Sequence, residues 1–366
     1  IKMKKKLIIF MPSIEGGGVE KNLFLVSNYL SEQLNKVALI TISKKYKKKF
    51  NNSIEFISPA ADYWDHLSRR LKYFLSLFLL IKEIIKSRNI TVFAFQANIY
   101  CILVCKLFSI EVIARSNSAP AGWSKNTIKK LIFRFFLNLA DRVMVNSLQF
   151  KKDLKREFHV NAACIYNPLN HYEIIKKSKE KSKKIFKNNK QLKILNIGRF
   201  TDQKDQLTLL KALNLIKKDI SFQAVIIGRG KLHGELLKYI YKNKLSHFIK
   251  IIDFVENPFP LLKQTDLFIL SSRYEGLPNV LLEALSLKKF IISSNCPTGP
   301  KEILLNGKGG LLFKVGDYKQ LARRIFYYQN NKEKCKELLK SSIKNMKRFD
   351  YKKNMQKYLS LVEKFI

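Results

Sequence analysis

Residues 192–204 read LKILNIGRFTDQK. Residues 192–197 form a short, mostly apolar run, which is typical of a buried strand in a parallel sheet. Gly198 and Arg199 then begin a loop that reaches Lys204, and a helical pattern follows it. Ligands of open parallel sheets bind outside the carboxyl ends of the strands, so we expect this loop to line a binding site.

The same alternation of strand and helix continues toward the end of the chain. Short apolar runs recur with helical patterns between them, and this predicts a parallel sheet with helices on both faces. The predicted strands of this half are residues 192–197, 224–227, 249–252, 267–270 and 290–293.

The first half of the chain has a similar pattern. An apolar run at residues 7–11 precedes a glycine-rich turn and a helical pattern at residues 19–34. Further strands are predicted at residues 37–42, 91–95, 112–114 and 142–145, and further helices at residues 69–86, 99–108, 125–139 and 148–158. The chain of 366 residues is therefore predicted to contain two α/β, Rossmann-like domains.

The boundary between the two domains is predicted from composition. Residues 176–190 almost lack apolar side chains, and we interpret them as a linker. We expect an N-terminal domain at residues 1–175 and a C-terminal domain at residues 191–345.

Charge and cysteine content limit the classes of partner. The formal net charge is +41, from 69 Lys and Arg against 28 Asp and Glu. Such a surface attracts phosphates, and nucleic acid, an anionic bilayer and a polyphosphate substrate all qualify. The five cysteines include no Cys-x-x-Cys pair, so we expect free thiols in a reducing compartment and no structural metal.

Membrane spans and targeting segments are not expected. No segment reaches the roughly 18 consecutive apolar residues that a transmembrane helix needs. The apolar run after Lys4, Lys5 and Lys6 is too short for a signal peptide, and the glycine-rich turn follows it directly.

Two loops could bind phosphate. Gly16-Gly17-Gly18 lies between a predicted strand and a predicted helix, where glycines admit a ligand and the helix N-terminus attracts an anion. A tight turn without a ligand is an equally good interpretation. Arg199 and Lys204 lie five residues apart on the loop after residue 197, and both could converge on a diphosphate. A solvated basic loop remains the alternative.

A pair of carboxylates provides the most specific motif. Residues 275–283 read EGLPNVLLE, which places Glu275 before a Gly-Leu-Pro turn and Glu283 about one turn into the next helix. Carboxylates accept hydrogen bonds from vicinal hydroxyls, so one can hold a sugar and the other a ribose. A loop acid beside an exposed helix acid is the alternative. Residues 296–302, CPTGPKE, predict a rigid turn from which no chemistry follows directly.

In combination these elements resemble glycosyltransferase family 4. That family has the GT-B fold, in which two Rossmann-like domains face each other across a cleft, and it carries a Gly-Arg-(few)-Lys loop and a Glu-x(7)-Glu element. The resemblance covers nearly the whole chain and includes a Gly-Gly-x-Glu element after the first strand. The matching residues are Gly17, Gly18, Glu20, Gly198, Arg199, Lys204, Glu275 and Glu283.

The resemblance implies a role for each matching residue. Arg199 and Lys204 bind the diphosphate, Glu275 contacts the donor sugar, and Glu283 contacts the ribose. The last helix, within residues 346–366, crosses back to the N-terminal domain. The expected donor-binding residues are Gly17, Gly18, Gly198, Val255, Gly276, Leu277, Asn279, Val280 and Glu283, and the expected catalytic residues are Arg199, Lys204, Glu275 and Asn117.

The chain departs from the family at two positions. Many members have a histidine after the strand that corresponds to residues 112–114, where this chain reads Arg115-Ser116-Asn117-Ser118, so Asn117 is the candidate replacement. Asp205 follows Lys204 where the family often has glycine. We expect neither change to remove activity.

The resemblance implies a retaining glycosyltransferase that uses a nucleotide-diphosphate sugar, and the family's commonest donors make UDP the expected nucleotide. Cations positioned beside the departing phosphate lower the barrier, and the chain has no Asp-x-Asp motif to hold a metal. A same-face substitution follows from the resemblance, and no cofactor is expected. The alternatives are a non-catalytic nucleotide-sugar-binding protein and a basic nucleic-acid-binding protein, which has no use for Glu275 and Glu283.

The expected acceptor is a glycan or a polyprenyl-diphosphate-linked glycan used in cell-surface polysaccharide synthesis. We expect a cytoplasmic enzyme that is peripheral on the inner face of the membrane and has no nucleic-acid partner. Residues 71–82 and 129–137 interleave basic and apolar side chains at helical spacing, as helices at an anionic bilayer surface do. Two core helices with basic edges are the alternative.

Overall fold

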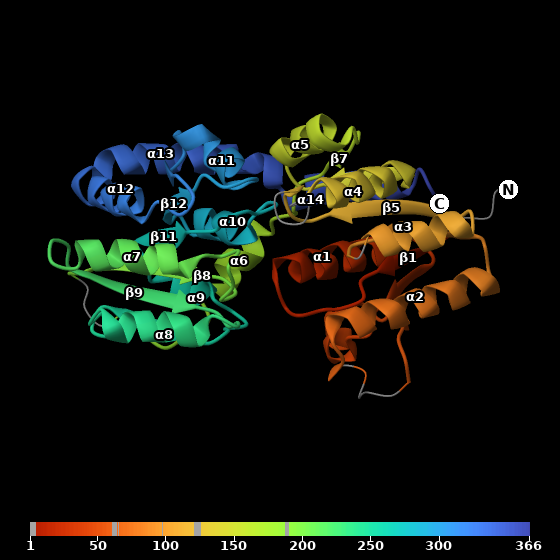
Figure 1. Ribbon diagram of the computed structural model, residues 1–366, viewed down its shortest axis with the longest axis horizontal. Coiled ribbons are helices and arrows are strands. Elements are labelled where there is room, and N and C mark those ends of the chain that lie inside the picture. The colour runs from red at the N-terminus through yellow and green to blue at the C-terminus, as the bar shows by residue number, and fades with distance from the viewer. Residues whose placement is uncertain (1–4, 61–63, 65, 97, 121–125, 187–189) are drawn as a thin grey trace. The chain divides into compact units, whose positions relative to one another are not determined.

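The computed structural model describes residues 5–60, 64, 66–96, 98–120, 126–186 and 190–366. The chain forms two compact units, and Figure 1 colours it by residue number. Unit 1 contains Ile1–Pro168 and Tyr351–Ile366, and unit 2 contains Leu169–Asp350.

Unit 2 is built on a parallel sheet that has six strands within the described residues, in the order β10-β9-β8-β11-β12-β13. The chain winds outward from β8 in one direction and from β11 in the other, so the strand order reverses between these two neighbours. All five predicted strands are confirmed, whereas β13 was not predicted. The strands are β8 (Leu192–Ile197), β9 (Phe222–Ile227), β10 (Ile249–Ile252), β11 (Leu267–Leu270), β12 (Phe290–Ser294) and β13 (Leu311–Phe313).

The helices of unit 2 cover this sheet. Apolar side chains of α7, α8 and α12 pack with the strands in one core that includes Phe200, Phe222 and Ile325. The helices are α6 (His171–Lys177), α7 (Gln206–Ile216), α8 (His233–Lys242), α9 (Phe259–Lys263), α10 (Asn279–Ser286), α11 (Pro300–Ile303), α12 (Tyr318–Asn330) and α13 (Lys332–Asn345), with short 3-10 turns η4 (Leu305–Gly307) and η5 (Met346–Phe349).

Unit 1 has a parallel sheet with seven strands in the described part of the chain, in the order β3-β2-β1-β4-β5-β6-β7. The edge strands β3 and β7 were not predicted, because two or three residues carry too little periodicity. The strands are β1 (Lys6–Phe10), β2 (Val37–Ile40), β3 (Glu55–Ile57), β4 (Ile90–Ala94), β5 (Glu111–Ser116), β6 (Arg142–Val145) and β7 (Ala163–Cys164).

Helices cover both faces of this second sheet. One core layer contains apolar residues of α2, α3, α4 and α5, and the other contains those of α1 and α14. The helices are α1 (Gly18–Gln33), α2 (Arg69–Lys86), α3 (Asn98–Leu107), α4 (Thr127–Leu139), α5 (Leu148–Phe158) and α14 (Tyr351–Val362), with the 3-10 turn η1 (Lys44–Lys49). Residue 125, where the predicted fourth helix begins, lies outside the described residues.

The chain passes between the units at Pro168 and again at Asp350. This first passage lies ahead of the predicted linker at residues 176–190. Helix α6 and the described residues of the predicted linker belong to unit 2, while residues 187–189 lie outside the described part. The final helix α14 belongs to unit 1, where it packs beside α1.

Candidate active site

The candidate site of unit 2 lies where the strand order reverses. The carboxyl ends of the neighbouring strands β8 and β11 meet there, because Leu267 and Phe268 pair with Ile194 and Leu195 in parallel register. Open parallel sheets bind ligands at such a reversal, since the loops diverge and leave room between them. The loop that starts at Gly198 and the loop that contains Glu275 follow these two strands.

An ion pair joins the two loops. Lys204 Nζ lies 2.5 Å from Glu275 Oε1, and Ser272 Oγ donates a hydrogen bond of 2.6 Å to the same oxygen. The side chains of Lys204 and Glu275 are only 16% and 7% exposed. Lys204 is therefore not freely solvated, because the loop after β11 covers it. The alternative of a solvated basic loop is wrong for this residue.

Asp205 explains the departure from glycine. Its backbone is in the left-handed region, with φ +46°, which glycine adopts without strain. The Asp205 side chain accepts hydrogen bonds from the N–H and the hydroxyl of Thr208, and so caps the start of α7. It also pairs with Arg273 Nε at 3.2 Å. Capping thus offsets the backbone strain that an aspartate brings to this position.

The motif at residues 296–302 supports the loop of Glu275. The Glu275 N–H donates to Pro297 O, and the Thr298 N–H donates in return to Glu275 O. Thr298 Oγ1 also donates to Gly276 O at 3.0 Å. A Cβ on Gly299 would lie 2.3 Å from Gly276 O, and its φ is +85°, so only glycine fits there. The rigid turn therefore holds the sugar-binding candidate in place.

Glu283 is a buried residue of α10. It is the fifth residue of that helix and is 5% exposed, while Glu275 is 6% exposed. The alternative of a loop acid beside an exposed helix acid is therefore wrong, because both carboxylates lie inside the fold. Leu277 is also buried, and Asn279 and Val280 are half-buried at the start of α10.

Gly228 and Gly230 adjoin Gly198, and neither was predicted as a site residue. A Cβ on Gly228 would lie 2.0 Å from Gly198 O, and a Cβ on Gly230 would lie 2.4 Å from Phe200 O. The Phe200 N–H donates to Arg229 O at 2.9 Å, so the two strand ends remain in contact beyond the sheet. The feature of the sequence that could have revealed this contact is the presence of two glycines directly after β9. Arg199 is exposed at this edge, and Val255 is half-buried in the loop after β10.

The glycine turn of unit 1 is partly occupied by its own helix. Glu20 Oε2 accepts a hydrogen bond of 3.0 Å from the Gly17 N–H, and Glu20 Oε1 accepts one of 3.3 Å from the Glu15 N–H. We expected free N–H groups for a phosphate at this turn. The Gly17 N–H is engaged instead, and Gly18 begins α1 as its first residue.

Asn117 is held by the neighbouring arginine. Its amide oxygen accepts a hydrogen bond from Arg115, and its amide nitrogen donates to Phe95 O at 2.6 Å. The Arg115 guanidinium is buried and donates to Asn167 Oδ1 at 2.9 Å and to the Tyr358 hydroxyl at 3.3 Å. The buried Arg115 cation thus orients Asn117 and contacts residues from both chain segments that form unit 1.

The sequence of this chain is similar to those of known proteins. Residues 177–347 match the family model described as glycosyl transferases group 1. The N-acetylgalactosamine-N,N'-diacetylbacillosaminyl-diphospho-undecaprenol 4-alpha-N-acetylgalactosaminyltransferase of Campylobacter jejuni is 27% identical over 85% of this chain and 86% of its own. The uncharacterized glycosyltransferase MJ1059 of Methanocaldococcus jannaschii is 32% identical over 56% of this chain, which spans about half (53%) of that relative. Residues 177–347 are of the group 1 type, and the chain is a glycosyltransferase.

The fold of this glycosyltransferase is shared with solved structures. The crystal structure of Anabaena Alr3699/HepE in complex with UDP-glucose superimposes with a TM-score of 0.77 at 15% identity. The match covers 98% of the transferase and 100% of that chain. The predicted GT-B class of two Rossmann-like domains is therefore confirmed.

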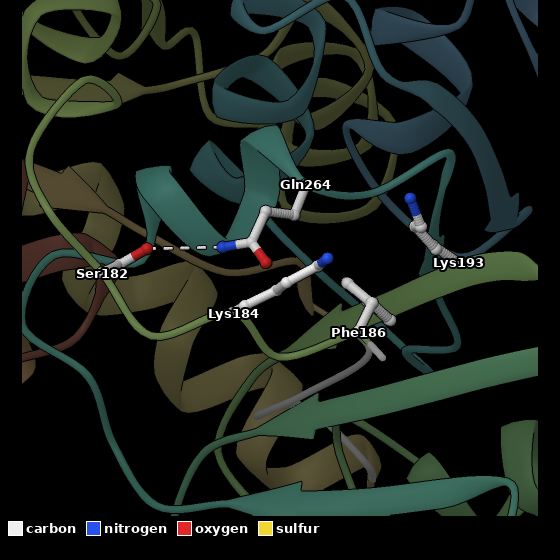
Figure 2. A pocket seen from close by; sticks show the side chains of 5 residues that line it. All are labelled: Ser182, Lys184, Phe186, Lys193 and Gln264. Carbon is white, nitrogen blue, oxygen red and sulfur yellow. Dashed lines mark hydrogen bonds between the residues drawn. The ribbon is translucent and has the colours of Figure 1, made fainter. Parts of the chain in front are cut away.

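A small cavity of the transferase lies away from the candidate site. It has a volume of about 300 Å³ and is lined by Ser182, Lys184, Phe186, Lys193 and Gln264. Figure 2 shows Gln264 donating to the Ser182 hydroxyl. Lys193 lies near the amino end of β8, whereas Gly198 follows the carboxyl end of that strand. The cavity is therefore at the opposite edge of the sheet from Gly198. Three of its lining residues, Ser182, Lys184 and Phe186, belong to the segment before β8, and we assign the cavity no ligand.

Membrane-spanning helices and metal sites were considered for the described part of the transferase. Among the residues that the structure describes, no helix is both long and apolar enough to span a bilayer. Within that same part of the chain, no group of three or more His, Cys, Asp or Glu side chains is placed to hold a metal ion.

Proposed function

We propose that this transferase moves a hexose or an N-acetylhexosamine from a UDP-sugar to a glycan or polyprenyl-diphosphate-linked acceptor, with retention of configuration. The ion pair of Lys204 and Glu275 at the reversal point of the unit 2 sheet carries this proposal. The Campylobacter jejuni relative is named for a diphospho-undecaprenol acceptor, and the Anabaena structure holds UDP-glucose. Both names support the proposed substrate classes.

In this proposal the two units have different substrates. Unit 2 provides most of the donor-binding residues, and unit 1, to which α14 returns, binds the acceptor and adds Gly17 and Gly18 to the donor-binding set. The donor-binding residues would be Gly17, Gly18, Gly198, Val255, Gly276, Leu277, Asn279, Val280 and Glu283. Asn117 would take the place of the family's histidine beside the donor sugar.

The chemistry of Lys204 supports a role at the diphosphate. An ammonium group has three N–H donors, and the contact with Glu275 uses one of them. Lys204 can therefore hold Glu275 and a phosphate oxygen at the same time. Arg199 is exposed at the same edge of the sheet and would supply the second cation. As the sugar–phosphate bond breaks, charge develops on the β-phosphate, and positioned cations stabilise that charge most in the transition state.

Glu275 suits the recognition of a sugar better than nucleophilic attack. Its Oε1 already accepts hydrogen bonds from Lys204 and Ser272, which occupy the lone pairs of this oxygen and weaken its nucleophilicity. A buried carboxylate held in this way can still accept from the hydroxyls of a sugar. We therefore propose a same-face substitution, in which the departing phosphate oxygen takes the acceptor's proton and no covalent sugar–enzyme bond forms. Glu283 would contact the ribose.

We propose that the reaction needs no metal and takes place in the cytoplasm, on the inner face of the membrane in cell-surface polysaccharide synthesis. The two cations of unit 2 would offset the diphosphate charge. A lipid-linked acceptor would keep the enzyme at an anionic membrane surface, and the basic and apolar helices of unit 1 suit such a surface.

The proposal is tested in two steps. A thermal-shift screen with UDP, GDP, ADP and their sugars identifies the donor, since a ligand that binds only the folded state raises Tm. The selected UDP-sugar is then incubated in excess EDTA with a polyprenyl-diphosphate-linked glycan, and the anomeric configuration of the product is read by NMR. An inverted product, or activity that disappears in EDTA and returns with a divalent cation, would contradict the mechanism.

A further inference from the structure

Helix α4 turns an apolar stripe away from the core. All of its residues are described, and of these only Leu137 is buried. Ile128 and Phe135 are 70% and 62% exposed. The exposed apolar residues recur at intervals of one to four positions, which places them on one side of a helix, opposite Leu137. They are Ile128, Leu131, Ile132, Phe135 and Leu139.

Helix α2 has the same arrangement. Its buried side contains Ser76, Leu80 and Ile84, which face the sheet. The opposite side would be polar in a helix that faces water, yet it exposes large apolar groups. These are Leu71, Phe74, Phe78 and Ile85. Part of this helix therefore serves the core, but the alternative of a core helix with a basic edge does not account for the apolar groups that it exposes.

Helix α3 joins the two stripes. It contacts α2 on one side and α4 on the other, and all three helices pack on the same core layer. Figure 1 shows them in succession on unit 1. Tyr100, Leu103 and Leu107 are exposed on α3. We name the outward side of these helices the α2–α4 face. Single exposed apolar residues are common, but a contiguous set marks a surface that binds a partner.

The charge of the α2–α4 face selects the partner. The only acidic residue of the three helices is Glu83, whose carboxylate is buried and held by Lys6 and Lys86. Outside the helices, Asp141 pairs with Lys106 and Glu157 pairs with Lys130. The basic residues of the three helices, of which Lys72 alone is buried, are Arg69, Arg70, Lys72, Lys82, Lys86, Lys106, Lys129, Lys130 and Arg134.

The basic side chains also occupy suitable positions. Lys129 and Arg134 are exposed and flank the apolar stripe of α4. Lys82 Nζ lies 4.7 Å from the centre of the Phe78 ring. Basic groups beside aromatic and aliphatic groups are the pattern of helices that lie in the plane of a bilayer surface.

We propose that the α2–α4 face docks on an anionic lipid bilayer, with the stripe of α4 inserted among the acyl chains and Lys129 and Arg134 at the headgroups. A second copy of this chain fits less well, because a self-complementary contact would bring like charges together. Nucleic acid would use the basic groups but would leave Ile128, Leu131 and Leu139 exposed. Only the purpose of this docking, which is to bring unit 1 to a lipid-linked acceptor, rests on the proposed function.

The test is sedimentation of the full chain with vesicles. Phosphatidylglycerol mixed with phosphatidylcholine is compared with phosphatidylcholine alone, at about 0.1 M and about 1 M salt, where charges are screened over roughly 10 Å and 3 Å. We expect binding to rise with phosphatidylglycerol and to fall with salt. Phe135→Glu should lower partitioning about tenfold or more, because it removes a large apolar group from the bilayer. Reversal of Lys129 and Arg134 to Glu should lower it at least about 25-fold, at about fivefold for each basic charge lost, and repulsion of the two new carboxylates adds to the loss.

Matched controls come from α8 of unit 2. Leu237, Lys238 and Lys242 are exposed there, so Leu237→Glu and the double reversal of Lys238 and Lys242 to Glu make the same chemical changes elsewhere. Partitioning of these variants should stay within about twofold of wild type for the apolar change and fall far less than 25-fold for the charge change, since only the α2–α4 face docks.

Each contrary outcome has a distinct meaning. Wild-type protein that stays in the supernatant with phosphatidylglycerol vesicles at low salt overturns the docking proposal, as does unchanged partitioning of Phe135→Glu. Self-association that Phe135→Glu abolishes, without vesicle binding, would assign the face to a second copy. UDP binding is measured on every variant. Vesicle binding by a wild-type protein that binds no nucleotide would instead overturn the proposed function and leave the docking proposal intact.

Discussion

Lys204 and Glu275 lie 71 residues apart in the sequence, yet their charged groups meet at 2.5 Å beneath the surface of unit 2. Each belongs to the loop that follows one of two neighbouring strands, β8 and β11. The lysine is thus both a candidate cation for the diphosphate and the partner of the candidate sugar-binding carboxylate. Changes at this pair should affect catalysis and stability together.

Lys204→Ala should lower turnover by roughly 100-fold or more, by analogy with the loss of one positioned donor. It should also lower the free energy of unfolding by about 3–5 kcal/mol, because it leaves the Glu275 carboxylate buried without its cation. Arg199→Ala is the control at an exposed position, where turnover should fall similarly and the free energy of unfolding should change by at most about 0.5 kcal/mol. Initial rates and urea unfolding measure both effects. Unchanged turnover in both variants would remove the diphosphate assignment.

Glu275→Gln and Glu283→Gln should affect different parts of the donor. Glu275→Gln keeps the shape but weakens hydrogen bonds to hydroxyls, so sugar transfer should fall while the affinity for free UDP stays nearly constant. Glu283→Gln should lower the affinity for UDP itself. Calorimetric titration with UDP, beside steady-state kinetics, separates the two. If the two phenotypes were exchanged, the roles of the carboxylates would be reversed.

Asp205→Ala should lower the free energy of unfolding by about 1–2 kcal/mol, because it removes the cap of α7 and keeps the left-handed backbone. Asp205→Gly should cost less, since glycine takes that backbone conformation without strain. Thermal and urea unfolding give the ranking. A glycine variant less stable than the alanine variant would show that the backbone conformation at this position is not the limiting factor.

Arg115→Lys should lower turnover by roughly tenfold, because an ammonium group cannot reproduce the planar fork that reaches Asn117, Asn167 and Tyr358. The affinity for UDP should stay constant, because Asn117 is proposed to lie beside the donor sugar and not beside the nucleotide. Tyr358→Phe removes the hydroxyl that Arg115 contacts and leaves Asn117 held, so it should retain turnover if orientation of Asn117 is the role of Arg115. Equal losses in both variants would instead indicate a general effect on unit 1.

Stability should decrease above pH 9 in part because of Cys296. Burial, with the charge of Glu275 adding to it, raises the pKa of this thiol from 9.0 to about 12. The folded state therefore keeps its proton between pH 9 and 12 while the unfolded state releases it, so unfolding is favoured as pH rises through that window. Cys296→Ala should show a smaller loss of Tm between about pH 8 and about pH 10.5 than wild type. An identical loss in both proteins would exclude a contribution from this thiol.

The sequence by itself determined the elements and the local motifs. Apolar runs predicted ten of the strands, because a strand buried on both faces in a parallel sheet needs a continuous apolar segment. The loops after residues 197 and 270 were also visible, since glycine, proline and charged groups interrupt the apolar pattern. The short strands β3, β7 and β13 left no such signal.

Only the tertiary structure decided which of these local features meet. Periodicity shows that a helix or strand exists, but not its neighbour, because strand order depends on contacts between distant segments. The sequence therefore could not show that Lys204 is paired and mostly buried, that Glu20 occupies the Gly17 N–H, or that Arg115 holds Asn117. The same reason applies to α4. Its apolar and basic residues were evident in the sequence, but whether its apolar stripe faces the core or the solvent depends on how the helix packs against the sheet.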